Sequence, residues 1–185
     1  MTERLWGGVI ILACITLRPF AETDPVVHIL VQLPVLAIAG YVLSPRKVVR
    51  PATAIALTVV AVTATAFWML PRSIDLAVAN GWADAVKFVT VPVCIGMALS
   101  MAWPNLPDLV RPFLKAQVLS MLGVLGFVYL HAPIRICNAY LQSDQERLGF
   151  GFLFVAGFLA LLWIYPVFSG GAFRAPARND VRLPI

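Results

Sequence analysis

The feature that most constrains this chain is an apolar run from Ala52 to Leu70. The run contains no charged residue, and Pro71 and Arg72 follow it directly. At a helical rise of ~1.5 Å per residue, about 20 apolar residues cross a bilayer hydrocarbon core about 30 Å thick. A helix of this length in a water-soluble domain keeps a polar stripe on one side. The run therefore predicts a transmembrane helix.

The rest of the chain repeats this pattern. Of the 185 residues 61% are hydrophobic and only 12% are charged, so a soluble domain could not shield its apolar surface from water. The sequence predicts an all-α, polytopic transmembrane helical bundle, with residues 1–173 forming a single integral membrane domain and residues 174–185 forming a basic tail. Charge-poor windows place six spans at residues 5–17, 26–43, 52–70, 88–103, 113–130 and 148–168.

The first window is short and resembles a signal peptide. Residues 18–22 follow it where a small-residue cleavage site would be needed, so we interpret the window as a retained helix.

The distribution of positive charge predicts the orientation. The side of the N-terminus carries nine of the 14 Lys and Arg residues: Arg4, Arg46, Lys47, Arg50, Arg111, Lys115, Arg174, Arg178 and Arg182. Five lie on the other side: Arg18, Arg72, Lys87, Arg135 and Arg147. Because cytoplasmic loops carry the excess of Lys and Arg, we expect both termini to be cytoplasmic, in a bacterial inner membrane. The net charge of +5 then reflects topology and gives no reason to expect a nucleic-acid partner.

The predicted spans are poor in ionisable groups. No charge occurs in residues 26–45, 51–71 or 148–173, and Lys87 and Lys115 lie near span ends, where we expect them to snorkel to the membrane surface. An ion-coupled transporter usually needs a charge near the midplane, so this pattern argues against transport. Span 52–70 carries small residues at close to helical spacing, and we expect it to be the central helix.

The residues with metal-binding chemistry fall on the outer side. His28 starts span two and His131 ends span five, and Met69, Cys137 and Asp144 lie at the same predicted depth. Imidazole, thioether and thiolate together suit copper, especially Cu(I). These five residues form our candidate metal site, although no short ligand motif supports it. The simpler interpretation is that both histidines hydrogen-bond to loop carbonyls at the interface, and a haem held by the two histidines is a further alternative.

No catalytic signature is present, so we expect a protein that is not an enzyme. The outer segments 71–82 and 131–147 mix apolar and charged residues, which is typical of short interfacial helices that lie on lipid or dock another subunit.

Three segments resemble a known family. Residues 28–33 (HILVQL), 67–75 (FWMLPRSID) and 144–149 (DQERLG) look like elements of the CtaG-type assembly factors of caa3 cytochrome c oxidase. The resemblance covers about a fifth of the chain and implies a polytopic bacterial membrane protein linked to copper delivery. His28 and Asp144 are the two residues of the candidate site whose positions match the family pattern. The chain departs from the family at Gln32 and Lys87, where the resemblance leads us to expect further histidines. If those histidines bind copper in the family, this chain has lost the metal and kept the scaffold.

Two functions remain open on this basis. The first is an accessory protein that assists assembly or copper loading of a membrane oxidoreductase. The second is a permanent, non-catalytic structural subunit of a respiratory or photosynthetic membrane complex. Both imply the lipid bilayer and other membrane protein subunits as partners.

Overall fold

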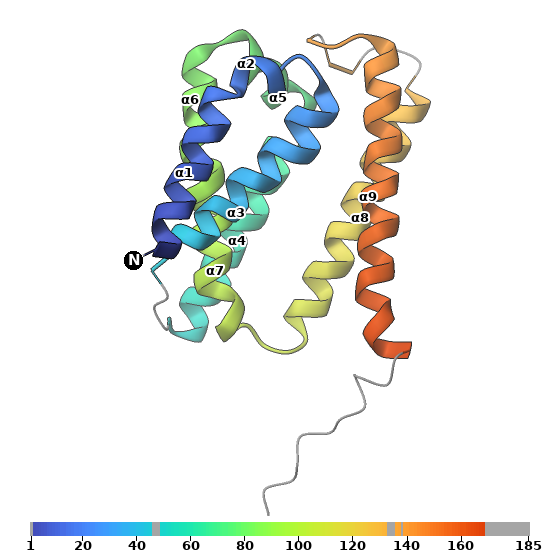
Figure 1. Cartoon of the computed structure of the whole chain (residues 1–185). Coiled ribbons are helices and arrows are strands. Elements are labelled where there is room, and N and C mark those ends of the chain that lie inside the picture. Colours follow the sequence, from blue (N-terminus) through green and yellow to red (C-terminus); the bar gives the residue numbers. More distant parts are fainter. Residues whose placement is uncertain (1, 46–48, 133–135, 138, 169–185) are drawn as a thin grey trace, which may run out of the picture.

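A computed structural model describes residues 2–45, 49–132, 136–137 and 139–168, and every regular element in these residues is a helix (Figure 1). The all-α helical bundle predicted from the sequence is confirmed. The predicted basic tail, residues 174–185, lies outside the described residues. The helices are α1 (Thr2–Thr16), α2 (Arg18–Ala21), the π-helix η1 (Val26–Gln32), α3 (Leu33–Leu43), α4 (Pro51–Trp68), α5 (Pro71–Ala79), α6 (Gly81–Thr90), the π-helix η2 (Val91–Met97), α7 (Ala98–Ala102), the 3-10 helix η3 (Trp103–Asn105), α8 (Val110–His131) and α9 (Gln142–Phe168).

Among the described residues, five continuous helical stretches are long and apolar enough to cross a membrane. They are Val26–Leu43, Pro51–Trp68, Gly81–Asn105, Val110–His131 and Gln142–Pro166. The first predicted span corresponds to α1, whose 15 residues are fewer than the ~20 that cross a bilayer. The stretch Gly81–Asn105 begins seven residues before the predicted start of the fourth span, because Asp84 and Lys87 interrupt the apolar pattern but not the helix.

The loop-rich end of the bundle contains α2, α5 and the first turns of η1 and α6, at the top of Figure 1. We call it the upper end, and we call the opposite end, with η3 and the start of α8, the lower end. Residues 71–79 form the predicted short helix, α5. The second expected interfacial helix, over 131–147, is wrong: the described residues between His131 and Leu141 are not helical, and α9 begins at Gln142.

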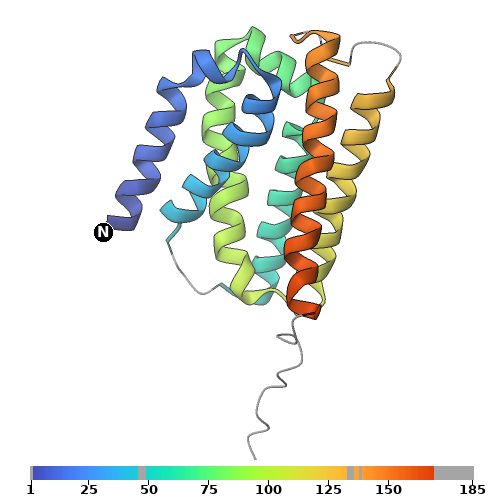
Figure 2. The same cartoon turned by 45° about the vertical axis from the view of Figure 1, so that its right-hand side comes forward.

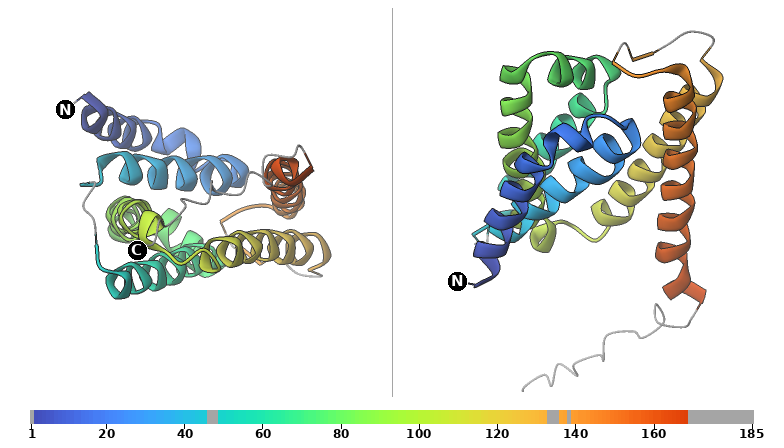
Figure 3. Two further views of the ribbon diagram at one scale, coloured as in Figure 1. Left: turned by 90° about the horizontal axis from the view of Figure 1, so that it is seen from below. Right: turned by 45° about the horizontal axis from the view of Figure 1, so that its top comes forward.

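The stretch Gly81–Asn105, and not α4, lies between its neighbours. The η2 segment packs against both α3 and α4, α1 runs beside α3, and α8 and α9 form a hairpin that reaches the other helices mainly where α9 meets η1 (Figure 2). The small-residue face of α4 is buried as predicted, with Ala54, Thr58 and Ala61 less than one tenth exposed. The expectation that α4 is central is nevertheless wrong, because only 22% of α4 is buried, against 33% of Gly81–Asn105. Figure 3, seen from below, shows α4 at the edge of the bundle.

Two prolines accompany the two π-helical segments. Pro34 is the second residue of α3, which directly follows η1, and Pro92 lies in the first turn of η2. A proline has no N–H to donate to the carbonyl four residues earlier, so the hydrogen-bond ladder is interrupted at each position. π-Helical turns inside α-helices are frequent at functional sites. In this chain η1 carries His28 and Gln32, which the next subsection places in one cluster.

Candidate functional site

Lys87 is the most unusual side chain in the structure, because its relative exposure is 0%. Its ammonium lies 2.9 Å from His28 Nε2, 3.3 Å from Gln32 Oε1 and 2.7 Å from Asp84 Oδ1. The ammonium donates hydrogen bonds to His28 Nε2 and Gln32 Oε1, and it forms an ion pair with the Asp84 carboxylate. The prediction that Lys87 snorkels to the membrane surface is therefore wrong. The group is held inside the protein instead.

Arg18 completes a balanced set of charges around Lys87. Its Nε lies 3.0 Å from Glu22 Oε1 and 2.9 Å from Asp84 Oδ2, and Lys87 Nζ lies 3.6 Å from the same Glu22 oxygen. Two cations thus share two carboxylates. The attraction between these opposite charges offsets the cost of removing them from water. A single buried charge would have no such attraction.

His28 is fully buried and has both ring nitrogens engaged. Nε2 faces the Lys87 ammonium, which can only donate, so we assign Nε2 as the acceptor and Nδ1 as the protonated nitrogen. Nδ1 then donates to the Tyr140 hydroxyl at 2.8 Å, and that hydroxyl donates to the Glu22 carbonyl oxygen at 3.2 Å. One chain of hydrogen bonds with consistent donors and acceptors therefore runs from Lys87 to the backbone of residue 22.

The remaining contacts connect distant segments to this network. Gln32 Nε2 donates to the Cys14 carbonyl oxygen at 3.4 Å, which joins η1 to α1. Burial raises the pKa of the Tyr140 phenol, and the Glu22 carboxylate raises it further, so Tyr140 stays a neutral donor. We refer to these side chains as the Lys87 cluster: Arg18, Glu22, His28, Gln32, Asp84, Lys87 and Tyr140.

The other candidate metal ligands lie in different surroundings from His28. His131 is exposed, stacks on Phe127 and bonds to the Phe127 carbonyl oxygen through Nδ1 at 2.9 Å. Asp144 lies 3.6 Å from Arg147 on the first turns of α9. Met69 is partly buried against the apolar core. His131 thus bonds to a carbonyl of its own helix, and His28 bonds to side chains, so neither histidine makes the bond to a loop carbonyl that the simpler interpretation expects.

Cys137 is buried and not open to the outer side. Its Sγ lies 3.3 Å from the Tyr129 hydroxyl, and its carbonyl oxygen accepts a hydrogen bond from Gln145 at 3.1 Å. Burial raises the pKa of its thiol above the usual value, so the thiolate that a metal prefers is disfavoured. The sequence had led us to expect Cys137 to face the outer compartment.

These surroundings do not suit a copper ion. Within the part of the chain that the structure describes, no three His, Cys, Asp or Glu side chains gather in a group that could hold a metal. A soft ion such as Cu(I) needs thiolate, thioether or free imidazole nitrogen. Both ring nitrogens of His28 are occupied instead, one by the Lys87 ammonium and the other by the Tyr140 hydroxyl.

Sequence reasoning missed most of the Lys87 cluster. Local spacing gave a partial signal, since Arg18 and Glu22 are four residues apart and Asp84 and Lys87 are three apart on helices. The decisive contacts are long-range: Lys87 and His28 are separated by 59 positions, and Tyr140 and His28 by 112.

No protein-family model, no curated protein and no solved structure matches this chain. The resemblance to CtaG-type factors therefore rests on the three segments quoted above.

Proposed function

We propose that this protein is a metal-free accessory protein of the membrane, without catalytic activity, that supports the assembly or stability of a larger membrane oxidoreductase. The observation that carries the proposal is the position of the Lys87 ammonium. It lies among an imidazole nitrogen, an amide oxygen and a carboxylate, which is where a bound cation would lie.

The resemblance to CtaG-type factors suggests why Lys87 contacts His28 and Gln32. Position 28 keeps the histidine expected from the CtaG-type pattern, whereas positions 32 and 87 depart from it as Gln and Lys. In the fold Lys87, on α6, contacts both His28 and Gln32, which lie on η1. A lysine that replaces one ligand also supplies a positive charge of its own. The scaffold then keeps its internal cation without binding a metal.

The remaining parts of the proposal follow from charge and exposure. The excess of Lys and Arg on the side of the N-terminus places the lower end in the cytoplasm and the upper end outside, across a bacterial inner membrane. Phe20, Trp82 and Leu141 are each more than 60% exposed near the upper end. Aromatic and apolar side chains of this kind suit an interface with another membrane subunit.

Two versions of this role differ in permanence. An assembly factor leaves its partner when the partner is complete, whereas a structural subunit stays at a fixed ratio. The copper-loading version is the less favoured, because His28 has no free nitrogen.

The test is purification of the tagged chain in a mild detergent, with mass spectrometry of the proteins that accompany it. We expect an oxidoreductase subunit to co-purify, and we expect loss of the chain to lower the amount of the assembled complex even when copper is abundant. A fixed ratio in the mature complex identifies a structural subunit, and enrichment in partly assembled complexes identifies an assembly factor. A chain that purifies alone, and whose removal changes no membrane complex, overturns the proposal.

A further inference from the structure

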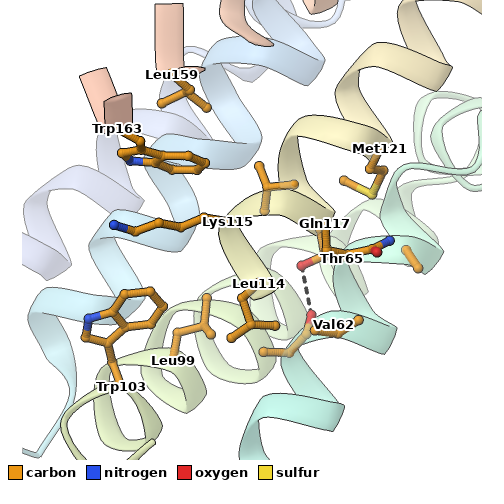
Figure 4. A pocket seen from close by; sticks show the side chains of 13 residues that line it. Val62, Thr65, Leu99, Trp103, Leu114, Lys115, Gln117, Met121, Leu159 and Trp163 are labelled. Atoms are coloured by element: carbon orange, nitrogen blue, oxygen red, sulfur yellow. Dashed lines mark hydrogen bonds between the residues drawn. The ribbon is translucent and has the colours of Figure 1, made fainter. Parts of the chain in front are cut away.

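A second site lies in the lower half of the molecule, away from the Lys87 cluster. A groove of about 380 Å³ separates α4 from the α8–α9 hairpin and extends down to α7 and η3 (Figure 4). Its walls are largely apolar, with Val62, Leu99, Met121 and Leu159 among the residues that line it. The volume lies within the ~300–1,000 Å³ typical of small-molecule sites.

The charged side chain that lines the groove lies at its lower end. Lys115 lies between the indoles of Trp103 and Trp163 in the view of Figure 4, and its ammonium is 5.5 Å from the centre of the Trp163 ring. Among the residues that the structure describes, no carboxylate forms an ion pair with Lys115. The groove therefore combines an apolar body with a positive charge that lacks an acidic partner there.

Arg111 adds a second positive charge one helical turn before Lys115 on α8. Its Nη2 donates to the Pro104 carbonyl oxygen at 3.2 Å, and its Nε is buried without a hydrogen-bond partner. Its only ion pair among the described residues is a 3.6 Å contact with the fully exposed Asp108. Residues four apart on a helix share a face, so both cations lie on the same side of α8. Together they could hold one anionic group.

We propose that this groove binds an anionic phospholipid of the lower leaflet, with an acyl chain between α4 and the hairpin and the phosphate at Lys115 and Arg111. Tryptophan and lysine are the residues that membrane proteins place at the level of lipid headgroups. An apolar groove above two indoles and beside two cations matches an amphiphile of this shape and charge.

The combination of apolar walls and a cation favours a lipid over a helix of a partner protein. A phospholipid carries an acyl chain and an anionic phosphate in one molecule. Carboxylates are rare on transmembrane helices, so a partner helix would cover the walls and leave the charge of Lys115 unpaired. The inference does not depend on the proposed accessory function.

The test is native mass spectrometry of the full chain in detergent, after delipidation and addition of phosphatidylglycerol or phosphatidylcholine. We expect one phosphatidylglycerol molecule to be retained in preference to phosphatidylcholine. The variant Lys115→Gln should lower that retention about tenfold, the effect of losing one charge-assisted contact. Arg147→Gln, which removes an exposed positive charge at the upper end, is the matched control and should retain lipid as the wild type does.

A photoreactive residue at Val118, which lines the groove, tests the site in an otherwise unchanged chain. We expect it to crosslink to phospholipid in membranes. Equal retention of both lipids, equal retention by Lys115→Gln and wild type, or crosslinking of position 118 to another protein would each overturn the proposal.

Discussion

At the residue scale, the central question is how a lysine remains charged inside a membrane protein. An isolated ammonium in hydrocarbon is costly, but Lys87 is surrounded by acceptors and by two carboxylates whose charge balances it and Arg18. The cluster is stable only as a set, because removal of any member leaves another buried group without its partner. This property makes it testable by single substitutions.

The first prediction concerns Lys87→Met. The change keeps the length of the side chain but leaves Asp84 and Glu22 with Arg18 as their only cation. Breaking a buried ion pair in this way costs about 3–5 kcal/mol, so we expect a large loss of stability in denaturant titrations in detergent. Arg147→Met, which removes an exposed ion pair with Asp24, is the control and should cost less than about 1 kcal/mol. Equal effects of the two substitutions would contradict our description of the cluster.

The second prediction concerns the thiol of Cys137. Burial raises its pKa, so the reactive thiolate is scarce in the folded state, and little of the side chain is open to reagent. We expect a variant with Cys137 as its only cysteine to react slowly with maleimide at neutral pH and rapidly after denaturation. The rate should rise as the pH increases towards the raised pKa. Rapid labelling of the folded protein at neutral pH is the outcome that our placement of Cys137 does not allow.

At the element scale, two glycines bring helices into backbone contact. A Cβ on Gly40 of α3 would overlap the Pro92 carbonyl oxygen, and a Cβ on Gly96 of η2 would overlap the Ala37 carbonyl oxygen. Neither helix can move away without separating α3 from the fourth span. Small residues at such crossings are the usual means of close packing in membranes.

The third prediction follows from this crossing. We expect Gly40→Ala or Gly96→Ala to destabilise the bundle by about 1–3 kcal/mol, because an extra methyl group must displace backbone atoms. Gly123→Ala on α8 is the matched control: a Cβ there meets nothing within 4 Å, so the helix should be unchanged or slightly more stable. Thermal melting in detergent compares the variants. Destabilisation by Gly123→Ala as large as that by Gly40→Ala would refute the packing argument.

The sequence predicts the presence of the membrane spans better than it predicts where each span begins. Apolar runs located the spans because hydrocarbon requires them. The sequence places the start of the fourth span at residue 88, because Asp84 and Lys87 interrupt the apolar run just before it. In the fold these two charges pair with each other inside the protein, and Asp84 also pairs with Arg18. Hydropathy along the chain does not reveal that a charge inside a span is neutralised by a residue of another helix, as Asp84 is by Arg18. The sequence does not predict the π-helical turns of η1 and η2. A proline interrupts the backbone hydrogen bonds of an α-helix, but it does not specify whether a kink or a π-helical turn results.

At the scale of the whole molecule, the fold class could be predicted because composition alone requires membrane helices. The candidate site could not. His28 was identified as a candidate residue, but its partners lie on α6 and at Tyr140, and only tertiary packing decides which side chains meet there. Of the five candidate metal ligands, His28 alone lies in the Lys87 cluster.

The fourth prediction concerns the orientation of the bundle. In a background without native cysteines, Trp82→Cys reports on the upper end and Leu109→Cys on the lower end, and both positions are more than 75% exposed. The excess of Lys and Arg on the N-terminal side predicts that a membrane-impermeant reagent labels position 82 from outside the cell and position 109 only after lysis. The opposite pattern would reverse the proposed topology.

The measurement that tests the central claim most directly is the copper content of the purified chain after growth in copper and gentle solubilisation. Because the Lys87 ammonium takes the place of a bound cation beside His28, we predict no stoichiometric copper, and no change in copper content on His28→Ala. About one copper ion per chain, lost on His28→Ala, is the loading expected of a genuine metal site and would contradict the account.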